Sequence, residues 1–239
     1  NINKMKKKLW SCIANCIFLF VCHSLSAQAP ALNNLSLKAS SPDNLTIDRL
    51  LCTYDKTGSV VETASAWYKN GSPEMLLYLP FEAGFSNALL DFSGNNNNTT
   101  TNEVITNDPF WDPEGGHNGA GAFVFDGNDY LLAGDIFPLN SSYTKTAWIN
   151  LSSSGFYSNI MSSILHAANN HCFKVDPDRR LNAGHYAGNA VVMDETALNV
   201  DEWYFVAVTF NYSTGEMILY KNGIEVDRDI VPETYRSVI

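Results

Sequence analysis

The sequence predicts an all-β protein built on antiparallel sheets. Apolar and polar residues alternate along Tyr143–Asn150 and along Trp203–Phe210, and both segments are rich in β-branched and aromatic residues. A third such segment, Glu216–Lys221, ends at the pair Asn222-Gly223. Alternation with a period of two, followed by an Asn-Gly turn, is typical of neighbouring antiparallel strands with one buried face. Elsewhere Gly, Asn, Ser and Thr separate short apolar runs, and no helical periodicity persists beyond about two turns.

Residues 1–29 have the three-part pattern of a secretory signal peptide. A basic cluster at Lys6–Lys8 precedes a mostly apolar run, Leu9–Cys22, and small residues follow around Ala27. We take Met5 as the natural start. The apolar run is about 14 residues long, whereas a membrane span needs about 20, so a cleaved leader is favoured over an amino-terminal anchor. The sequence therefore predicts a secreted or cell-surface protein that is not inserted in a membrane after cleavage.

The composition is acidic, with a formal net charge of −10. The leader carries four lysines and no acid, so its removal lowers this charge by four, to −14. A surface this acidic repels nucleic acids and anionic lipids, which excludes nucleic acid as a partner. Two cysteines, Cys52 and Cys172, lie outside the leader. In an oxidising compartment they form a disulfide with each other or with other partners.

Residues 30–74 are predicted to form a linker followed by part of an immunoglobulin-like module. The segment is polar and loop-like up to Asp48, and two strands follow, Arg49–Tyr54 and Thr63–Lys69. The first strand carries Cys52 and the second carries Trp67. This pair resembles strands B and C of an immunoglobulin-like sandwich, in which the cysteine bridges the sheets beside the tryptophan.

Residues 75–239 contain five short sequence motifs in a defined order. An aromatic-acid opening precedes an Asp-x-Ser-Gly-Asn loop, a Gly-x-Gly-Ala-Phe-x-Phe-Asp-Gly strand, an Ala-Trp-Ile strand, and a Trp-Tyr-x-Val-Ala-Val-Thr strand with its hairpin. They lie at Phe81-Glu82, Asp91–Asn95, Gly119–Gly127, Ala147–Ile149, and Trp203–Thr209 with Leu219–Gly223. Together they resemble the laminin-G-like, concanavalin A-type jelly-roll family. The resemblance implies an antiparallel jelly-roll sandwich over 75–239.

The same resemblance implies further strands after Arg228, so we expect the sequence to be a fragment whose jelly roll is truncated at the C-terminal end. The jelly roll also begins before the immunoglobulin-like strands are completed. Because a domain with adjacent ends can be inserted into a loop of another domain, we expect the partner of Cys52 to lie beyond Ile239.

Two loops offer oxygen ligands on glycine-containing turns. Asp91 lies in the first, and Asp126 and Asp129 lie in the second. Such hard donors suit calcium, and related jelly rolls often carry a structural calcium ion. The alternative is that these carboxylates accept backbone hydrogen bonds that shape their own turns. Calcium is the only cofactor that the sequence predicts.

No catalytic residue is predicted. Glycoside hydrolases of this fold need two facing carboxylates, one of which stays protonated. The compact Glu-x-Asp-x-Glu pattern of retaining β-glucanases is absent from the sequence. The acids Glu195, Asp201 and Glu202 flank a turn, where charges usually cap a sheet edge. A set of possible metal ligands, His166, His171 and Cys172, matches no zinc spacing.

Carbohydrate binding needs aromatic faces for the C–H surface of a sugar, with polar groups beside them. The aromatic residues that alternate regularly within strands, Trp148, Trp203, Phe123 and Phe125, are expected in the core. The predicted ligand-binding residues are instead those in loop-like segments: Phe156, Tyr157, Tyr186, His185, Trp111 and Arg179, with Asp176 as a polar partner. For Trp111 the alternative is packing beneath the Asn-rich loop.

These observations predict a non-catalytic extracellular recognition module that binds a polysaccharide or an extracellular protein within a larger modular protein. One alternative is an accessory module of a secreted hydrolase whose catalytic domain lies outside this sequence. Another is a structural adhesin spacer in which no loop binds a specific ligand.

Overall fold

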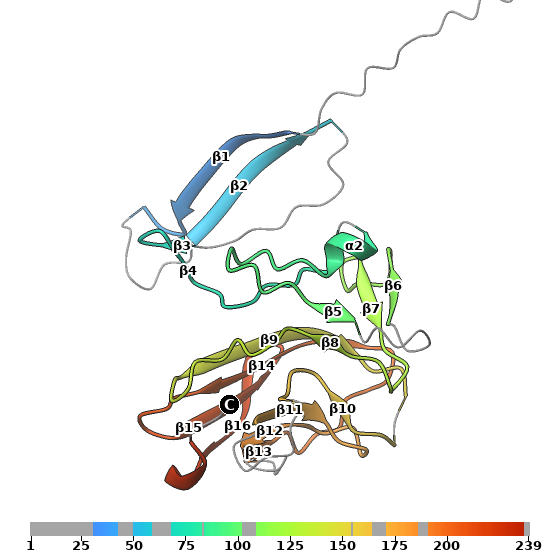
Figure 1. The fold of residues 1–239 in the computed structure, drawn as a ribbon, viewed down its shortest axis with the longest axis vertical. Helices are drawn as coiled ribbons and strands as arrows, with labels where there is room; N and C mark the ends of the chain where they lie inside the picture. The colour runs from blue at the N-terminus through green and yellow to red at the C-terminus, as the bar shows by residue number, and fades with distance from the viewer. Residues whose placement is uncertain are drawn as a thin grey trace, which may run out of the picture. The chain divides into compact units, whose positions relative to one another are not determined.

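The computed structural model describes residues 31–42, 50–58, 68–82, 84–101, 109–153, 155–163, 171–185 and 191–236. These residues form strands, turns, one short α-helix and one 3-10 helix (Figure 1). The predicted signal peptide and Trp67 lie outside them. The chain divides into two compact units, 1–61 and 62–239. Among the described residues, no helix is long and apolar enough to cross a membrane.

The first unit is a two-stranded antiparallel sheet. β1 (Ala31–Ala39) pairs with β2 (Leu50–Thr57), and Leu37 lies opposite Cys52. The strand prediction for Arg49–Tyr54 is thus confirmed, whereas the loop prediction for the region before it is wrong over β1. Polar residues in β1 conceal the alternation, and a register irregularity between Asn33 and Ser36 interrupts it. The immunoglobulin-like arrangement stays a prediction.

The second unit contains fourteen strands among its described residues, most of them short. Two helical turns accompany them, α2 (Phe85–Ala88) and η1 (Glu233–Tyr235). The strands are β3 (Tyr68–Lys69), β4 (Ser72–Pro73), β5 (Thr100–Thr101), β6 (Phe110–Asp112), β7 (Ala122–Val124), β8 (Leu131–Leu132), β9 (Tyr143–Asn150), β10 (Ser158–Asn159), β11 (His171–Val175), β12 (Leu181–His185), β13 (Val192–Met193), β14 (Trp203–Phe210), β15 (Glu216–Lys221) and β16 (Ile224–Ile230).

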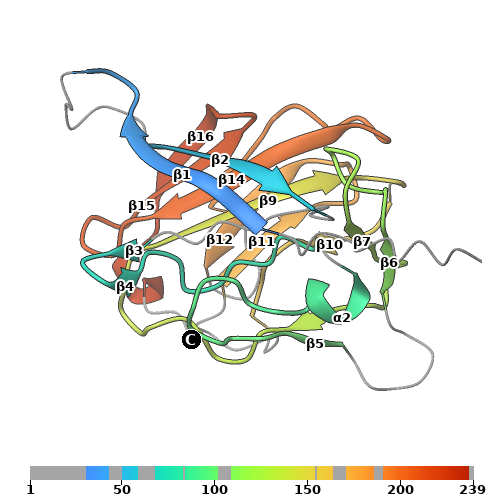
Figure 2. The same ribbon diagram turned by 90° about the horizontal axis from the view of Figure 1, so that it is seen from above.

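Two four-stranded antiparallel sheets form the body of this unit. One has the order β16-β15-β14-β9 and is called sheet A; the other has the order β10-β11-β12-β13 and is called sheet B. β14 pairs with β9 along its whole length, from Trp203 opposite Asn150 to Phe210 opposite Tyr143. Seen from above, sheet A overlies β11 and β12 (Figure 2). The prediction of an antiparallel sandwich is confirmed.

The hydrophobic core lies between the two sheets. In sheet A it includes Val206, Val208 and Phe210, and in sheet B it includes Phe173 and Leu181. All five are at most 2% exposed. Burying a side chain of this size contributes about 1.5–3 kcal/mol, so this layer supplies most of the stabilisation. Because side chains alternate along a strand, the other half of each strand faces away from the core.

The two Asn-Gly hairpin turns have the backbone angles that their sequences favour. Asn70 and Gly71 have φ angles of 52° and 83°, and Asn222 and Gly223 have φ angles of 53° and 79°. Two successive positive φ angles define the hairpin turn that Asn-Gly sequences favour. The predicted turn between β15 and β16 is therefore confirmed.

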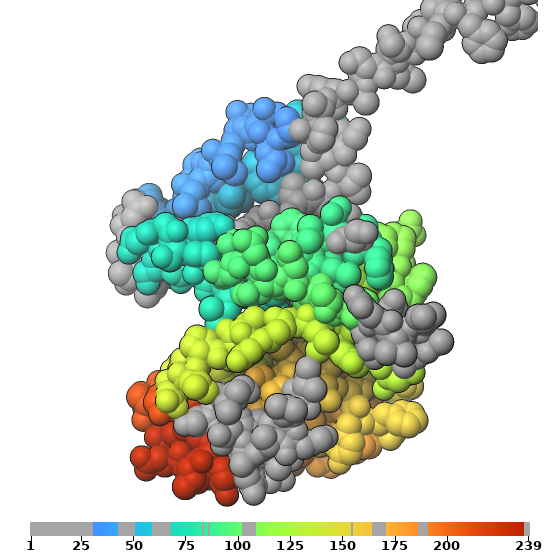
Figure 3. Space-filling view, in the orientation of Figure 1, coloured from blue at the N-terminus to red at the C-terminus, as the bar shows by residue number. Residues whose placement is uncertain are grey.

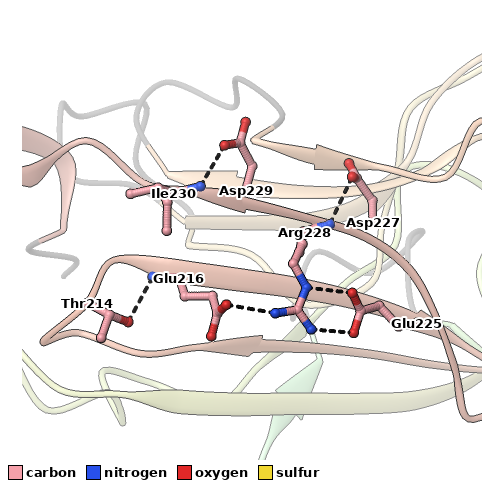
Figure 4. Close-up of polar contacts among 7 residues, drawn as sticks. All are labelled: Thr214, Glu216, Glu225, Asp227, Arg228, Asp229 and Ile230. Atoms are coloured by element: carbon pink, nitrogen blue, oxygen red, sulfur yellow. Dashed lines mark hydrogen bonds and ion pairs between the residues drawn. The ribbon is translucent and has the colours of Figure 1, made fainter.

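The outer strand β16 carries a charged network on sheet A. Arg228 donates two hydrogen bonds of 2.6 Å to the Glu225 carboxylate and one of 2.9 Å to Glu216 on β15 (Figure 4). Asp227 on the same strand accepts a hydrogen bond of 2.8 Å from the backbone N–H of Met193 in β13. Charged side chains on an outer strand discourage pairing with other chains, and the Asp227 contact ties the two sheets together.

The segment between β4 and β8 consists largely of loops, which pack closely against one another in the space-filling view (Figure 3). Its opening, residues 75–82, forms no strand. Trp111 fastens it by donating a hydrogen bond of 2.8 Å from Nε1 to the Phe81 carbonyl, and the Gly121 N–H donates to Glu82 Oε2 at 3.1 Å. The predicted strand Gly119–Gly127 is shorter in the structure, where it is β7, paired with β6.

Candidate functional site

The outer face of sheet A carries an open hollow with aromatic walls. Its volume is about 470 Å³, and it is lined by Trp148, Trp203, Phe205, Asn222 and Gly223. The Trp148 side chain is 46% exposed, although tryptophan is among the most buried side chains on average. An exposed indole in a concave surface is a feature of binding sites rather than of cores.

The strand pairing brings the rings together. Trp148 on β9 lies directly opposite Phe205 on β14, and their ring centroids are 5.4 Å apart. Trp203 is two residues from Phe205 and therefore shares its face of the sheet. The core face of the same strands is occupied by Val206 and Val208. Period-two alternation thus directs all three rings away from the core.

The β15–β16 turn supplies the polar wall of the hollow. Asn222 Oδ1 accepts a hydrogen bond of 3.0 Å from the Phe205 N–H, and the Asn222 N–H donates to the Phe205 carbonyl at 2.7 Å. These two bonds hold the turn against β14. A hydrogen-bonding side chain therefore stands in a defined position beside the aromatic rings.

An imidazole ring already stacks on the indole of Trp148. The ring centroids of His117 and Trp148 are 3.9 Å apart and their planes are 17° from parallel. The same imidazole meets Trp203 edge to face at 6.2 Å. His117 is exposed at the tip of a tight loop, in which the Gly119 N–H donates to the Gly116 carbonyl at 2.9 Å. His117 therefore covers one face of the Trp148 indole, and the rest of the ring contributes to the wall of the hollow.

The prediction that Trp148 belongs to the core is wrong. In β9 the core-facing set is Tyr143, Ala147 and Ile149, so the intervening Trp148 points outward. Trp203 is half-buried on the same outer face. In β14 the sequence carried a signal, because the buried set Tyr204, Val206, Val208 and Phe210 is uniformly apolar and excludes Trp203. In β9 it did not, because the buried set contains Lys145. Of the other two aromatics expected in the core, Phe123 is buried and Phe125 is 44% exposed.

The loop residues predicted to bind ligand are dispersed. Phe156 and Tyr157 are 75% and 65% exposed, as expected. Trp111 is half-buried and bonded to Phe81, which favours the packing alternative. Arg179 sits in a turn with a φ angle of 67°, where its N–H donates to the Asp176 carbonyl at 2.8 Å. Tyr186 lies outside the described residues.

His185 is not in an exposed loop, so the sequence-based placement of this residue is wrong. It is the last residue of β12 and is 2% exposed. Its Nδ1–H donates to the Tyr235 carbonyl at 2.8 Å, and its Nε2 accepts a hydrogen bond of 2.8 Å from the Tyr143 hydroxyl. The core-facing alternation of β12 places it among buried residues, although the Gly- and Asn-rich sequence around it suggests a loop.

His185 belongs to a buried polar cluster inside the sandwich. Lys145, which is 2% exposed, donates hydrogen bonds from Nζ to His171 Nδ1 and, at 3.0 Å, to the Met161 carbonyl. Burial lowers the pKa of Lys145 to about 7. Burial, and then the neighbouring charge of Lys145, lowers the pKa of His171 to about 3. Burial also raises the pKa of Tyr143.

Two aromatic rings flank the Lys145 amine. The ring centres of Tyr143 and Phe137 lie 4.9 and 5.2 Å from Lys145 Nζ. The cluster is sealed from the hollow, because Lys145 and Trp148 face opposite sides of β9.

The Asp91 carboxylate is surrounded by hydrogen-bond donors. Oδ1 accepts from the N–H groups of Tyr78 and Ser93 at 2.9 and 2.8 Å, and Oδ2 accepts from the Asn97 N–H at 2.9 Å and the Ser93 hydroxyl at 2.7 Å. Burial raises the pKa of Asp91, but these donors outweigh burial and hold the pKa below its usual value. The contacts support the alternative in which Asp91 shapes its own turn.

The second candidate calcium loop also bonds to itself. Asp129 Oδ2 accepts from the Asp126 N–H at 2.9 Å, and Asp126 Oδ1 accepts from the Asn128 N–H at 3.4 Å. Within the described part of the chain, no three His, Cys, Asp or Glu side chains gather closely enough to hold a metal ion. Calcium binding by Asp91, Asp126 and Asp129 stays a prediction.

The substitution Asp91→Asn separates the two interpretations of this loop. If Asp91 shapes the turn, the variant is expected to unfold more easily by about 1–3 kcal/mol, because buried donors lose their acceptor. The loss is expected to be equal with calcium and with a chelator. Thermal unfolding in both buffers measures it. A wild-type midpoint that rises with calcium, together with a variant that has lost this rise, would instead identify Asp91 as a calcium ligand.

The acids near the β14 strand form a capped turn. Glu202 Oε2 accepts hydrogen bonds of 2.8 Å from Asn199 Nδ2 and from the Tyr204 hydroxyl, and these two bonds lower the pKa of Glu202. Asp201 occupies the turn with a φ angle of 59°. A glycosidase acid needs a raised pKa, so Glu202 has the opposite character.

The set His166, His171 and Cys172, whose spacing matches no zinc site, is only partly described by the structure. His171 and Cys172 lie in β11, and His166 lies outside the described residues.

Cys52 and Cys172 are both free thiols in the structure. Cys52 is exposed on β2 of the first unit, and Cys172 is buried on β11 of the second. Burial raises the pKa of the Cys172 thiol, which keeps it protonated and unreactive. A disulfide between these two residues is thus absent from the structure, and a partner for Cys52 elsewhere stays a prediction.

Comparisons with known proteins agree with this fold. Residues 125–237 match the laminin G model described as the concanavalin A-like lectin/glucanases superfamily. A solved structure of a candidate carbohydrate binding protein from Bacteroides ovatus ATCC 8483 is 19% identical, with a TM-score of 0.36. The match covers 43% of this chain and 29% of that one, and it is too distant to indicate a ligand. No curated protein matches the chain. Residues 125–237 therefore match the concanavalin A-like lectin/glucanases superfamily in sequence, and the second unit has the antiparallel jelly-roll sandwich that the resemblance implied.

Proposed function

We propose that this protein is a non-catalytic extracellular module that binds a glycan in the hollow formed by Trp148, Trp203, Phe205 and Asn222. The observation that carries the proposal is the 46% exposure of Trp148 at the wall of an open hollow of about 470 Å³. A sugar presents an apolar C–H face and a rim of hydroxyl groups. The aromatic rings match the first, and the Asn222 amide at the edge matches the second.

The charge of the chain narrows the class of glycan. The formal net charge is −10, and the five residues that line the hollow are all uncharged. An anionic polysaccharide would be repelled by the protein as a whole and would find no cation in the lining. The ligand class that fits is therefore a neutral polysaccharide. The superfamily that residues 125–237 match is described by its lectins and glucanases, which supports a carbohydrate ligand.

Truncation of the central ring tests the site. The substitution Trp148→Ala is expected to weaken binding of a neutral polysaccharide at least tenfold, since a stacked ring contributes on the order of 1.4 kcal/mol or more. Affinity electrophoresis against soluble gluco-, manno- and galacto-configured polysaccharides would find the ligand, and calorimetry would measure the change.

Thr146→Ala is the matched control, because Thr146 is exposed two residues away on the same face of β9. It is expected to bind like the wild type. Equal binding by the wild type and Trp148→Ala, with both folded by circular dichroism, would remove the hollow from consideration as the glycan site. If no neutral polysaccharide is retained by the wild type, the proposed function itself fails.

A further inference from the structure

A second exposed aromatic group lies on sheet B. Phe156 and Tyr157 directly precede β10, and they are 75% and 65% exposed. The loop that presents them is anchored, because the Gly155 N–H donates to the Pro177 carbonyl at 3.0 Å. The Lys174 ammonium lies 4.7 Å from the centre of the Tyr157 ring, which orients that ring over β11. Tyr157 is therefore held in place while most of its surface remains open.

The register of sheet B gathers polar side chains beside this ring. Asn159 lies opposite Lys174, and Lys174 lies opposite Asn182. Their neighbours Phe173 and Val175 belong to the core, so Lys174 and its cross-strand partners face away from it. Asp176, the residue that follows β11, lies 3.6 Å from the Lys174 ammonium through Oδ1. Tyr157, Lys174, Asp176 and Asn182 are called the Tyr157 corner.

Two side-chain oxygens in the Tyr157 corner accept no hydrogen bond, although one of them, Asp176 Oδ1, forms an ion pair with Lys174 at 3.6 Å. Within the described part of the chain, Asp176 Oδ1 and Asn182 Oδ1 are buried and accept no hydrogen bond. Asn182 is 0% exposed as a residue. Buried polar atoms are normally hydrogen-bonded, and an unpartnered one calls for an explanation such as a bound ligand. The Asp176 carboxylate is partly exposed and holds Lys174 only at 3.6 Å, so it retains capacity to accept a hydrogen bond from a sugar hydroxyl.

We propose that the Tyr157 corner is a second glycan-binding surface for neutral sugars and that the module is bivalent. The ring of Tyr157 takes the C–H face of the sugar. Lys174 donates to one hydroxyl, and the Asp176 carboxylate accepts from another, because both side chains are partly exposed, whereas Asn182 is buried beneath them. This combination of donors and acceptors suits hydroxyl groups and offers no cluster of unpaired cations for an anionic sugar, because Lys174 is already paired with Asp176.

Bivalence follows from the position of the two sites in the sandwich. The Trp148 hollow lies on the outer face of sheet A, and the Tyr157 corner lies on the outer face of sheet B. The core packs between these sheets, so their outer faces, and with them the two surfaces, point in opposite directions. One sugar chain cannot lie flat on both. Two chains, or two branches of one polymer, would be held together with an avidity greater than either site provides.

Stoichiometry tests this proposal, which rests on glycan binding at the hollow. The whole chain is titrated by calorimetry with neutral hexasaccharides of glucose, mannose and galactose. The wild type is expected to bind two molecules of one of them. Trp148→Ala and Tyr157→Ala are each expected to bind one, and the double variant none. Tyr157→Phe keeps the ring and is expected to retain both sites. Light scattering with the corresponding long polysaccharide is expected to show cross-linking by the wild type and none by either alanine variant.

The possible failures differ from one another. One bound hexasaccharide, lost in Trp148→Ala and unchanged in Tyr157→Ala, would overturn bivalence and leave the proposed function intact. One bound hexasaccharide, lost only in Tyr157→Ala, would overturn both bivalence and the hollow as the glycan site. No binding of any hexasaccharide would overturn both proposals. Circular dichroism of each variant ensures that a lost site is not a lost fold.

Discussion

The free energy of unfolding is expected to fall by about 2 kcal/mol for each of two buried histidines when the pH is lowered from 6.5 to 5. Burial lowers the pKa of His171 to about 3 and that of His185 to about 4. In the unfolded chain both have pKa values of about 6.5. Between these values the unfolded state binds more protons than the folded state, so acid favours unfolding. The effect vanishes only above about pH 7.5, where both residues are neutral in both states.

The structure gives the reason for these low pKa values. His185 donates from Nδ1 to the Tyr235 carbonyl and accepts at Nε2 from Tyr143, so a second ring proton would break the latter bond. His171 Nδ1 faces the Lys145 amine, and protonation there would place two cations in contact. Neither ring is more than 4% exposed, so water cannot stabilise the added charge.

Urea unfolding at steps between pH 7.5 and pH 5 measures this effect, since most carboxylates stay ionised over that range. The variants His171→Asn and His185→Gln keep hydrogen-bonding capacity without the titration. Each is expected to flatten the pH dependence, whatever its own stability. A wild-type protein whose stability is constant between pH 6.5 and pH 5 would contradict the prediction.

The substitution Lys145→Met is expected to stabilise the protein by on the order of 3 kcal/mol at pH 7. Burial lowers the pKa of Lys145 to about 7, against about 10.4 in the unfolded chain. At neutral pH the Lys145 amine therefore binds its proton more tightly in the unfolded chain than in the folded one. This difference lowers the free energy of unfolding. Stability should rise with pH from 7 to 10.4 in the wild type, because there the unfolded state binds the additional proton. Methionine has a similar volume and removes the charge.

Urea unfolding at pH 7 and pH 9.5 distinguishes the outcomes. The advantage of Lys145→Met should shrink at the higher pH, where the lysine is neutral in the folded state. The exposed Lys69 offers a control, and Lys69→Met should change little at either pH. A Lys145→Met variant less stable than the wild type at both values would show that the amine contributes structure through its bonds to His171 and Met161. Glycan binding should not change at pH 7, because Lys145 faces the core and Trp148 faces the opposite side of β9.

The positions of the main strands could be predicted from local sequence alone. β9, β14 and β15 lie where their alternation placed them, and the Asn222-Gly223 turn has the backbone angles that this pair favours. β1 was missed, because polar residues and a register irregularity hide its pattern. The expected opening of the jelly roll at residues 75–82 forms no strand, because side-chain and backbone contacts from Trp111 and Gly121 hold it as a loop.

The sequence predicts the type of site, an aromatic surface for a glycan, but not the residues that form the hollow. An aromatic surface for a glycan was expected, and Tyr157 was among its residues, but the tryptophans that form the hollow were assigned to the core. The period-two pattern allows a strand to turn either set inward, and a large aromatic residue is the usual choice for the core. In β9 the inward set instead contains a lysine, which no rule based on hydrophobicity would bury.

The fold class, the main antiparallel strands and their turns follow from the local sequence, because these features depend on residues that are close together in the chain. The face of each strand that is covered depends instead on tertiary packing. It placed Lys145 and His185 inside and Trp148 outside, since burial depends on what the opposite sheet presents. The same packing brought Lys174 across from Asn182 and set the two aromatic surfaces on opposite sides of one core. These contacts join residues that are distant in the chain, so the local sequence pattern cannot predict them.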